Sequence, residues 1–481
     1  MSDNDITNST ENNDEKKSSI EIIGGTFELN KIVELAQKDA DKNFDVEKAK
    51  QQLKEGAVVF SGKAAGVCYM PDNYTEVGIQ NEKSALARAE GCGKSGHHSV
   101  FDHCTVNILI NTSKIMAMTL NSLGVYTTSE KSARYTKMKP KTELEEQLYN
   151  KWRKTFRKLV LDKYPSYDDD ALSKMLCKKL GIEYDANAVQ NGSLLHIKED
   201  EYMEEELEKL KKNTSLPSYK IAQENARYMI SVFTPTTMIY SVSFRQVGLI
   251  IEYLGKLIKD CEKSNDLFST QLAEEAVDLK KAFEDAFGDL IVKDTKNQYI
   301  RFFAAQHQKA IFLSGVFKKD HIGDSYTITY NASLAMIAQA QRHRTLRYTM
   351  YLSKPGEFGF YVPELIRGTE LESEWVSDIN SVKDIIPQGT LVRITEQGIF
   401  EDFALKCKER LCGRAQLEIC EKTAEVMDMF IKNSNELSIE NQLLLGTMTY
   451  NNKPCARCMF KDYTCKDRCY WGAWQALTRK I

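Results

Sequence analysis

A supersecondary pattern that occurs twice, about 220 residues apart, constrains the fold of this chain more than any other feature. Residues 104–111, CTVNILIN, alternate polar and apolar positions, as a half-buried β-strand does, and residues 326–331, YTITYN, alternate in the same way. An asparagine and a small hydroxyl residue then offer a helix N-cap before an apolar helical run, IMAMTLNSL or LAMIAQAQ. The sequence therefore predicts an internal repeat of strand and helix.

A second pair of matching blocks lies downstream of the first. One begins at Ala226 with ARYMISVFTPTTMIYSVSFRQVGLIIEYL, and the other begins at Val382 with VKDIIPQGTLVRITEQGIFEDFALKC. Each block has the pattern of a turn followed by a long, apolar-striped helix. Because 481 residues are many for one compact core, two or three domains are expected. The simplest interpretation is an α+β protein of two tandem modules.

The composition excludes several classes of function. The net charge of −3 gives no strong overall field, so an anionic partner must be held by a local group of cations. No stretch approaches the roughly 18 apolar residues of a membrane span, and the N-terminus lacks the apolar core of a secretion signal. Eight cysteines are scattered singly through the first 420 residues, which suits a reducing cytoplasm. We therefore expect a cytoplasmic protein whose acidic residues 1–20 are disordered.

Three basic or titratable side chains, Arg342, His343 and Arg344, close the predicted helix of the second repeat within QAQRHRTLRYTM. Cations at a helix C-terminus interact favourably with the helix dipole by about 0.3–1 kcal/mol, so a charged helix end in solvent is one explanation. The alternative is a pocket for an anion or a cofactor. The flanking sequence favours the pocket, because the apolar helix before these residues and the aromatic segment after them are both expected in the core.

These motifs resemble the flavin-dependent thymidylate synthases, the ThyX family, whose pattern runs from a histidine-rich segment through a strand and a helix to RHR, seven residues and a serine. The second repeat has RHR, with Leu352 at the serine position and Ser353 one place later. The first repeat has HHSVFDH at 97–103 and SEKSARY at 129–135, but Ser-Leu-Gly at 122–124 in place of RHR. One repeat thus carries the first half of the family pattern, and the other carries the second half.

The resemblance implies a tandem fusion of two divergent ThyX copies, each a twisted, mostly antiparallel sheet flanked by helices. The expected limits, in chain order, are a disordered N-terminus at 1–20, copy 1 at 21–292, copy 2 at 293–450 and a cysteine-rich tail at 451–481. Active sites in this family lie between the subunits of a homotetramer. A fused chain would therefore rebuild this assembly as a homodimer, with each set of site residues shared between copy 1 and copy 2.

The residues that match the family's binding positions divide between the two copies. The resemblance implies a nucleotide site formed by Glu130, Ser132, Arg134, Arg227, Gln339, Arg342 and Arg410. It implies a flavin site formed by His97, Ser99, Asp102, Arg245, His343 and Arg344. A nucleotide phosphate is a dianion that guanidinium groups bind well. Arg342 and Arg410 are the expected catalytic groups, with Arg410 at the uracil-side position, where a cation polarises the ring carbonyls.

Four cysteines at the C-terminal end form a group of their own, with the spacing C-x2-C-x6-C-x3-C. Four thiolates so close in sequence can bind one tetrahedral Zn²⁺ or an iron–sulfur cluster, and the sequence leaves both open. Cations and acids alternate in the same segment as on an ordinary solvated surface, so nucleic-acid binding is not indicated. The predicted metal ligands are Cys455, Cys458, Cys465 and Cys469.

The resemblance implies an FAD-dependent thymidylate synthase that methylates dUMP to dTMP, with 5,10-methylenetetrahydrofolate as the carbon donor and NADPH as the reductant. Its partners would be small-molecule nucleotide and folate substrates, without a membrane or nucleic acid. Two alternatives stay open. A flavin-contacting asparagine of the family is Leu249 in copy 1 and Leu405 in copy 2, so the product could be another 5-substituted pyrimidine nucleotide, such as a hydroxymethylated one. The chain could instead be a catalytically inactive scaffold that binds nucleotide or flavin.

Overall fold

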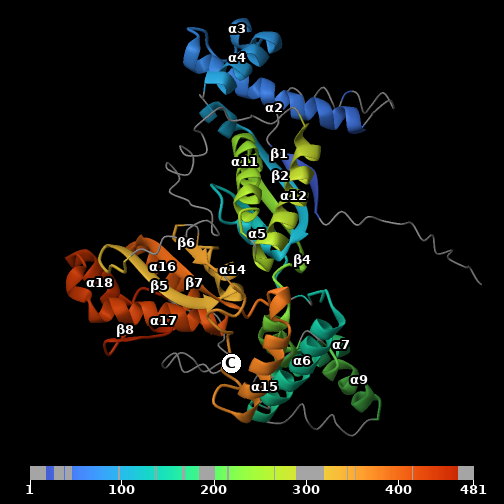
Figure 1. Cartoon of the computed structure of the whole chain (residues 1–481), viewed down its shortest axis with the longest axis vertical. Helices are drawn as coiled ribbons and strands as arrows, with labels where there is room; N and C mark the ends of the chain where they lie inside the picture. The colour runs from blue at the N-terminus through green and yellow to red at the C-terminus, as the bar shows by residue number, and fades with distance from the viewer. Residues whose placement is uncertain are drawn as a thin grey trace, which may run out of the picture. The chain divides into compact units, whose positions relative to one another are not determined.

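The chain divides into two compact units in a computed structural model. Unit 1 comprises Met1–Glu130 and Pro235–Gln306, and unit 2 comprises Lys131–Thr234 and His307–Ile481. Figure 1 shows their helices and strands along the chain. None of the described helices is long and apolar enough to cross a membrane. The structure describes residues 18–25, 37, 46–95, 98–134, 136, 138–164, 168–181, 183, 201–213, 216–264, 266–288, 319–343, 345–352, 354–413 and 415–463.

Unit 1 contains a four-stranded antiparallel sheet in the order β1-β2-β4-β3. β2 buries alternate residues, including Ile108 and Ile110, because successive side chains of a strand point to opposite faces. β1 begins at Ser19, and residues 1–17, expected to be disordered, lie outside the described residues. The strands are β1 (Ser19–Gly25), β2 (Thr105–Ser113), β3 (Thr127–Glu130) and β4 (Pro235–Ser243).

Helices pack on this sheet and on each other in unit 1. α11 (Phe244–Cys261) and α12 (Leu267–Phe287) lie side by side, and α5 (Lys114–Leu120) follows β2 directly (Figure 1). α11 starts at Ser243, whose side chain accepts a hydrogen bond from the backbone N–H of Gln246 at 3.2 Å, as an N-cap does. The remaining helices of the unit are α2 (Val46–Tyr69), α3 (Val77–Gln80), α4 (Glu82–Ser95) and the 3₁₀ helix η1 (His98–His103).

Unit 2 contains a three-stranded antiparallel sheet in the order β5-β7-β6. The strands are β5 (Ser325–Ser333), β6 (Arg347–Tyr351) and β7 (Leu391–Ile399). The helix α17 packs against both α14 and α16. The elements of this part of the unit are α14 (Leu334–Ala340), α16 (Phe400–Arg410), α17 (Leu417–Lys432), η7 (Ser434–Glu436), α18 (Ile439–Thr447), β8 (Thr449–Tyr450), β9 (Lys453–Pro454) and η8 (Arg457–Met459).

A helical part of unit 2 is built from both of its sequence stretches. Trp152 and Phe156 of α6 pack against Trp375 of α15, with the two tryptophan ring centroids 4.9 Å apart and those of Phe156 and Trp375 5.4 Å apart. All three side chains are fully buried, and each stabilises the unit by about 1.5–3 kcal/mol. The helices of this part are α6 (Glu143–Lys163), α7 (Asp169–Leu180), α9 (Glu201–Lys211), α10 (Pro217–Ala226), η4 (Arg227–Met229), α15 (Glu370–Ser381) and η6 (Lys383–Ile385).

Three strands of each sheet share the same order and the same pairing, β2-β4-β3 in unit 1 and β5-β7-β6 in unit 2. β2 pairs with β4 so that Ser113 faces Pro235, and β5 pairs with β7 so that Ser333 faces Leu391. In each sheet a shorter strand, β3 or β6, pairs with the other edge of β4 or β7, and a seven-residue helix, α5 or α14, follows the first strand. The expected mixture of helices with antiparallel sheets is confirmed, and both predicted strand–helix runs form.

Two short segments that precede β4 and β7 pair with each other inside unit 2. Residues 230–232 and 386–388 run antiparallel, with Ser231 opposite Pro387. Backbone hydrogen bonds of 2.9 and 2.8 Å lie on either side of this bridge. Ser231 lies four residues before β4 and Pro387 lies four residues before β7, so corresponding positions of the two matching sequence blocks face each other. This local two-fold arrangement brings both blocks into one unit.

Candidate functional site

The end of α14 brings part of the RHR motif into the interior of unit 2. Ser333 caps the helix, because its side chain accepts a hydrogen bond from the backbone N–H of Met336 at 3.0 Å. The helix ends at Ala340, and in the turn that follows only 5% of His343 is exposed, while Arg342 is half-buried. A fully solvated helix end, the simpler explanation of this motif, is therefore excluded for His343.

His343 and Arg410 form the first contact of the site. Arg410, the last residue of α16, donates a hydrogen bond from Nε to Nε2 of His343 at 2.6 Å. Burial, together with the positive charges of Arg410 and Lys406, lowers the pKa of His343 to about 2. The imidazole is therefore neutral at physiological pH and accepts at Nε2. This contact fixes the guanidinium of Arg410 at the end of its helix.

Gln416, between α16 and α17, is the second contact point. Its side-chain oxygen accepts hydrogen bonds from Arg227 and from the amide of Gln339, and its amide donates to the hydroxyl of Tyr228. Arg227 and Tyr228 belong to η4, whereas Gln339 belongs to α14. Gln416 therefore links the start of α17 to η4 and to α14, which come from the two sequence stretches of unit 2.

Glu418 supports this arrangement from the first turn of α17. Its carboxylate accepts hydrogen bonds from the backbone N–H of Ser333 at 2.7 Å, from the Ser333 hydroxyl at 2.5 Å and from the Tyr228 hydroxyl at 3.0 Å. Burial raises the pKa of Glu418, and these hydrogen bonds and the charge of Arg227 oppose that shift. Glu418 thereby fixes the start of α14 relative to η4.

Arg134 and Arg227 come from the first stretch of unit 2. Nε of Arg134 lies 2.9 Å from Oε2 of Glu224, and its backbone N–H donates to the Ser132 hydroxyl at 3.3 Å. The side-chain amide of Gln223 donates to the carbonyl of Arg134 at 3.4 Å. Only 4% of Arg227 is exposed, and its Nε has no hydrogen-bond partner among the described residues. Arg227 therefore retains a buried donor for a further ligand.

Four guanidinium groups of unit 2, those of Arg134, Arg227, Arg342 and Arg410, form an arginine cluster. Burial lowers the pKa of Arg410, the charge of Glu409 opposes this shift, and the nearby charges of Arg134 and Arg342 add to it. Burial also lowers the pKa of Arg227, the charges of Glu224 and Glu418 oppose this shift, and the charge of Arg134 adds to it. Like charges at this range repel one another, so an anion bound among them would be stabilised. The cluster contains guanidinium donors from both sequence stretches of unit 2.

The predicted nucleotide residues divide between the units. Arg134, Arg227 and the three residues of the second repeat lie in unit 2, as does Ser132. Glu130 lies at the end of β3 in unit 1, where its buried carboxylate pairs with Lys114. The side-chain amide of Asn121 donates to the same carboxylate at 3.4 Å. Thr236 also donates to it at 3.5 Å, so Glu130 has partners within unit 1, and its role in a nucleotide site stays a prediction.

The predicted flavin residues of copy 1 lie in unit 1. Arg245 pairs with Asp102, with 2.7 Å between Nη1 and Oδ2, and the Ser243 hydroxyl donates to the other carboxylate oxygen at 2.8 Å. Nε of Arg245 is buried and has no hydrogen-bond partner in the described part of the chain. Ser99 is exposed in η1. His97 and Arg344, also predicted for this site, lie outside the described residues.

The cysteine-rich segment is described only in its first half. Cys455 is buried, which raises its thiol pKa to about 11, and Cys458 is half-buried. Cys465 and Cys469 lie outside the described residues. Within the described ranges, no group of three or more histidine, cysteine, aspartate or glutamate side chains could hold a metal ion. The metal site expected from the cysteine spacing therefore stays a prediction.

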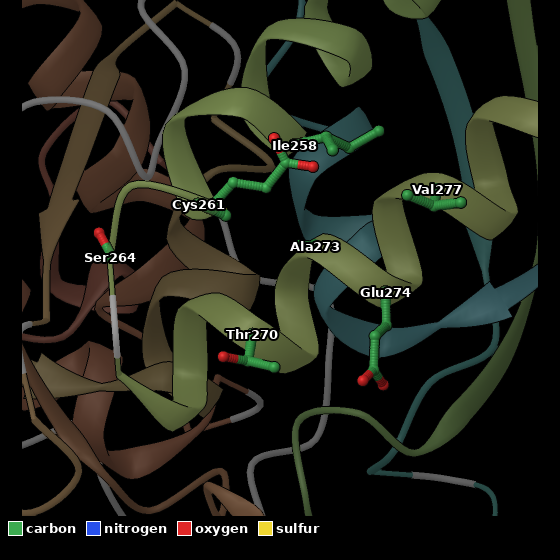
Figure 2. A pocket seen from close by; sticks show the side chains of 8 residues that line it. Ile258, Cys261, Ser264, Thr270, Ala273, Glu274 and Val277 are labelled. Carbon is green, nitrogen blue, oxygen red and sulfur yellow. The ribbon is translucent and has the colours of Figure 1, made fainter.

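A separate hollow of about 700 Å³ lies in unit 1 between α11 and α12 (Figure 2). It is open and is lined by residues of both helices and of the turn between them, among them Cys261, Thr270 and Val277. None of the predicted site residues lines it.

Sequence reasoning missed the residues that hold the arginine cluster in place. These are Glu224, Tyr228, Gln416 and Glu418. Glu224 and Arg227 are three residues apart at the end of a helix, so their spacing could have indicated a shared face. The roles of Gln416 and Glu418 follow from contacts with residues far away in the sequence, which no local pattern encodes.

The chain matches one family of known proteins. Residues 55–254 match the model of the family described as thymidylate synthase complementing protein, Thy1. This range begins within α2 and ends within α11, so it includes Arg134 and Arg227 but stops before β5. The match covers less than half of the chain, and over these residues it confirms the resemblance to the ThyX family. No curated protein sequence matches the chain.

Several solved structures share features with it at low identity. The flavin-dependent thymidylate synthase ThyX from Helicobacter pylori, complexed with FAD and dUMP, is 16% identical, with 59% of this chain and 97% of that chain covered and a TM-score of 0.26. A second ThyX structure from the same organism is 18% identical over 51% and 92% of the two chains, with a TM-score of 0.24. The UMP/dUMP methylase PolB from Streptomyces cacaoi is 13% identical over 49% and 76%, with a TM-score of 0.22. The family assignment rests on the sequence match, because such TM-scores do not establish a common fold.

Proposed function

We propose that this protein is a flavin-dependent thymidylate synthase that methylates dUMP to dTMP, with 5,10-methylenetetrahydrofolate as the carbon donor and NADPH as the reductant. The observation that carries the proposal is the arginine cluster. Its four members come from both sequence stretches of unit 2, which also holds Gln339 and Ser132. The family match supports the choice of a nucleotide as the anion.

The phosphate of the nucleotide would bind at Arg134, Arg227 and Arg342. A buried guanidinium is costly unless an anion or several hydrogen bonds compensate it. Arg227 is 4% exposed and donates to the neutral oxygen of Gln416, while its Nε has no partner in the described part of unit 2. A phosphate dianion, which guanidinium groups bind in a bidentate manner, would supply that compensation.

The pyrimidine ring would face Arg410. Neutral His343 accepts from Nε, and Oε2 of Glu409 lies 3.7 Å from Nη2, so the other N–H groups of Arg410 would donate to a carbonyl oxygen of the ring. A cation at this place stabilises negative charge that develops on the ring oxygen while carbon 5 accepts the new substituent. In this role Arg410 orients and polarises the substrate, and no protein nucleophile is required.

The flavin would bind at the residues of unit 1 that surround Asp102. The buried Nε of Arg245 has no partner among the described residues and fits an anionic group such as the pyrophosphate of FAD. Ser99, Asp102, Arg245 and His97 would hold this cofactor from copy 1, with His343 and Arg344 from copy 2. When bound, FAD would relay a hydride from NADPH to the transferred carbon.

We further propose that the chain is a tandem fusion and acts as a homodimer. The equal register of the two sheets supports a duplicated module. The presence of residues 131–234 in the same unit as the second matching block supports sites that both copies share. In this proposal Cys455, Cys458, Cys465 and Cys469 bind Zn²⁺ or an iron–sulfur cluster at the C-terminal end.

The proposal is tested by binding and turnover with matched variants. The purified protein should show flavin absorbance, bind dUMP and convert it to dTMP with the folate and NADPH. Arg134→Ala and Arg342→Ala should each lower dUMP affinity about 100-fold, since each removes charged hydrogen bonds worth about 1.5–3 kcal/mol. Arg367→Ala is the control, because it removes an arginine outside the cluster whose exposed side chain contacts Glu364 at 2.5 Å, Glu421 at 3.9 Å and the carbonyl of Val362 at 3.2 Å.

Three outcomes separate the alternatives. A product one oxygen heavier than dTMP, seen by mass spectrometry, would identify a hydroxymethylating enzyme. The buried position of Leu249, where the family has a polar flavin contact, favours this second candidate. A colourless protein that cannot be reconstituted with FAD would indicate an inactive scaffold. Full activity of either arginine variant would contradict the shared site.

A further inference from the structure

The C-terminal turn of α16 is held by a residue of the cysteine-rich segment. The last carbonyl groups of a helix have no partner within the helix and need one elsewhere. Arg457 supplies two: its backbone N–H donates to the carbonyl of Leu411 at 2.7 Å, and its Nη1 donates to the carbonyl of Lys408 at 3.1 Å. The cationic guanidinium also interacts favourably with the negative end of the helix dipole.

The segment that carries Arg457 is itself well anchored. Cys455 and Phe460 are 2% and 3% exposed, and the Cys455 thiol donates to the carbonyl of Met448 at 3.3 Å. The backbone N–H of Lys461 donates to the carbonyl of Thr447 at 2.9 Å, at the end of α18. A packed segment of this kind can hold a fixed position against α16, which a freely moving tail cannot.

The clamped turn lies between two residues of the proposed nucleotide site. Arg410 is the last residue of α16, and Gln416 is the last residue before α17. Arg457 contacts the backbone on either side of Arg410, at residues 408 and 411. The direction of Arg410, which these two contacts flank, therefore depends on how this turn is held.

The corresponding helix of unit 1 has no such clamp in the part that the structure describes. α11 begins at the position that matches the start of α16 but continues for 18 residues, whereas α16 ends after 11. Where α16 has Arg410, α11 has the buried Leu254. The clamp therefore occurs at α16, the helix that ends at Arg410, the candidate catalytic residue.

We propose that Arg457 is a positioning residue for the nucleotide site, which acts through the C-terminal turn of α16 and keeps Arg410 directed at the base. This inference rests on the proposed function. In this scheme Arg457 acts on the nucleotide through Arg410, whose position in the backbone it flanks. A salt bridge at the same helix end joins Lys408 to Asp462 over 2.5 Å. It is exposed and contributes little to the stability of the turn.

The test compares two ligands that differ only in the base. dUMP contacts both the phosphate-binding arginines and Arg410, whereas 2-deoxyribose 5-phosphate lacks the base and contacts only the former. Isothermal titration should show about a tenfold loss of dUMP affinity in Arg457→Ala and less than a twofold change for 2-deoxyribose 5-phosphate. Both variants retain the backbone contact of residue 457. Arg457→Lys also retains the charge and should recover part of the loss, and Arg367→Ala should match the wild type.

A double-mutant cycle separates positioning from a general loss of structure. In an Arg410→Ala background, Arg457→Ala should have no further effect on dUMP affinity, because its route to the ligand is gone. Equal loss for both ligands, additive losses in the cycle, or unchanged dUMP affinity in Arg457→Ala would each overturn the inference. Failure of the wild-type protein to bind dUMP would instead overturn the proposed function, so the two failures are distinguishable.

Discussion

The neutral state of His343 gives a measurable dependence of stability on pH. In the folded protein its pKa is lowered to about 2, while an unfolded chain restores the ordinary value of about 6.5. Above pH 6.5 neither state is protonated, so the residue has no pH-dependent effect there. As the pH falls below 6.5, only the unfolded state gains the proton, and the folded state loses stability relative to it.

The magnitude follows from the distance between the pH and the unfolded pKa. Each pH unit below 6.5 costs about 1.4 kcal/mol, so the loss from pH 6.5 to pH 4.5 is about 3 kcal/mol from His343 alone. The side chain is 5% exposed, so solvent screening reduces this figure little. His343→Gln lacks a titratable group, but its side-chain oxygen can still accept from Arg410. The unfolding free energy of His343→Gln should therefore not include the loss of about 3 kcal/mol that His343 causes between pH 6.5 and pH 4.5.

The assay is urea unfolding at several pH values between 4.5 and 7.5, followed by tryptophan fluorescence. Trp152 and Trp375 are fully buried in unit 2 and report its unfolding. The difference in unfolding free energy between the wild type and His343→Gln cancels the other titrating groups. Between pH 6.5 and 4.5, the wild type should lose about 3 kcal/mol more unfolding free energy than His343→Gln. A difference that stays constant within about 1 kcal/mol would mean that folded His343 takes up a proton, and the described contact with Arg410 would be refuted.

Three further predictions concern other parts of the structure. Lys406→Met removes one partner of a fully buried ion pair with Glu396 of 2.7 Å, so urea unfolding should show a loss of about 3–5 kcal/mol, and adding Glu396→Gln should cost less than the sum of the two single changes. Gly124→Ala should lower the melting temperature of unit 1, because Gly124 has φ +64° and a Cβ would lie 2.1 Å from Oε1 of Gln246; an unchanged melting temperature would contradict the described turn. Arg245→Ala should reduce the flavin content of the purified protein while dUMP affinity stays within twofold, and retention of full flavin content would argue against the proposed cofactor site.

The alternation of residues was sufficient to predict the strands of the repeat. The stretches 104–111 and 326–331 correspond to β2 (Thr105–Ser113) and β5 (Ser325–Ser333). The helix start was predicted less closely, since Asn111 and Thr112 continue the strand and Ser113 is the N-cap position. They continue it because β4 offers backbone partners up to Pro235, and this pairing is a property of the sheet that the local sequence does not contain.

The composition of the arginine cluster was predictable, but its supports were not. Guanidinium groups at family positions could be recognised from the sequence one by one. Their arrangement depends on Trp152 and Trp375, which join stretches more than 200 residues apart, and on the buried carboxylate of Glu418. The periodicity of a helix indicates which face is buried but does not indicate which distant helix covers that face.

The pairing of Ser231 with Pro387 has a consequence for how such a chain can change over time. In a symmetric assembly of identical subunits, any substitution at this position would appear on both sides at once. Here the N–H of Ser231 donates to the Glu145 carboxylate at 2.8 Å, while the opposite position is a proline, which has no N–H to satisfy. Because one chain contains both positions, a substitution can change one of them without changing the other. The two positions can therefore diverge independently.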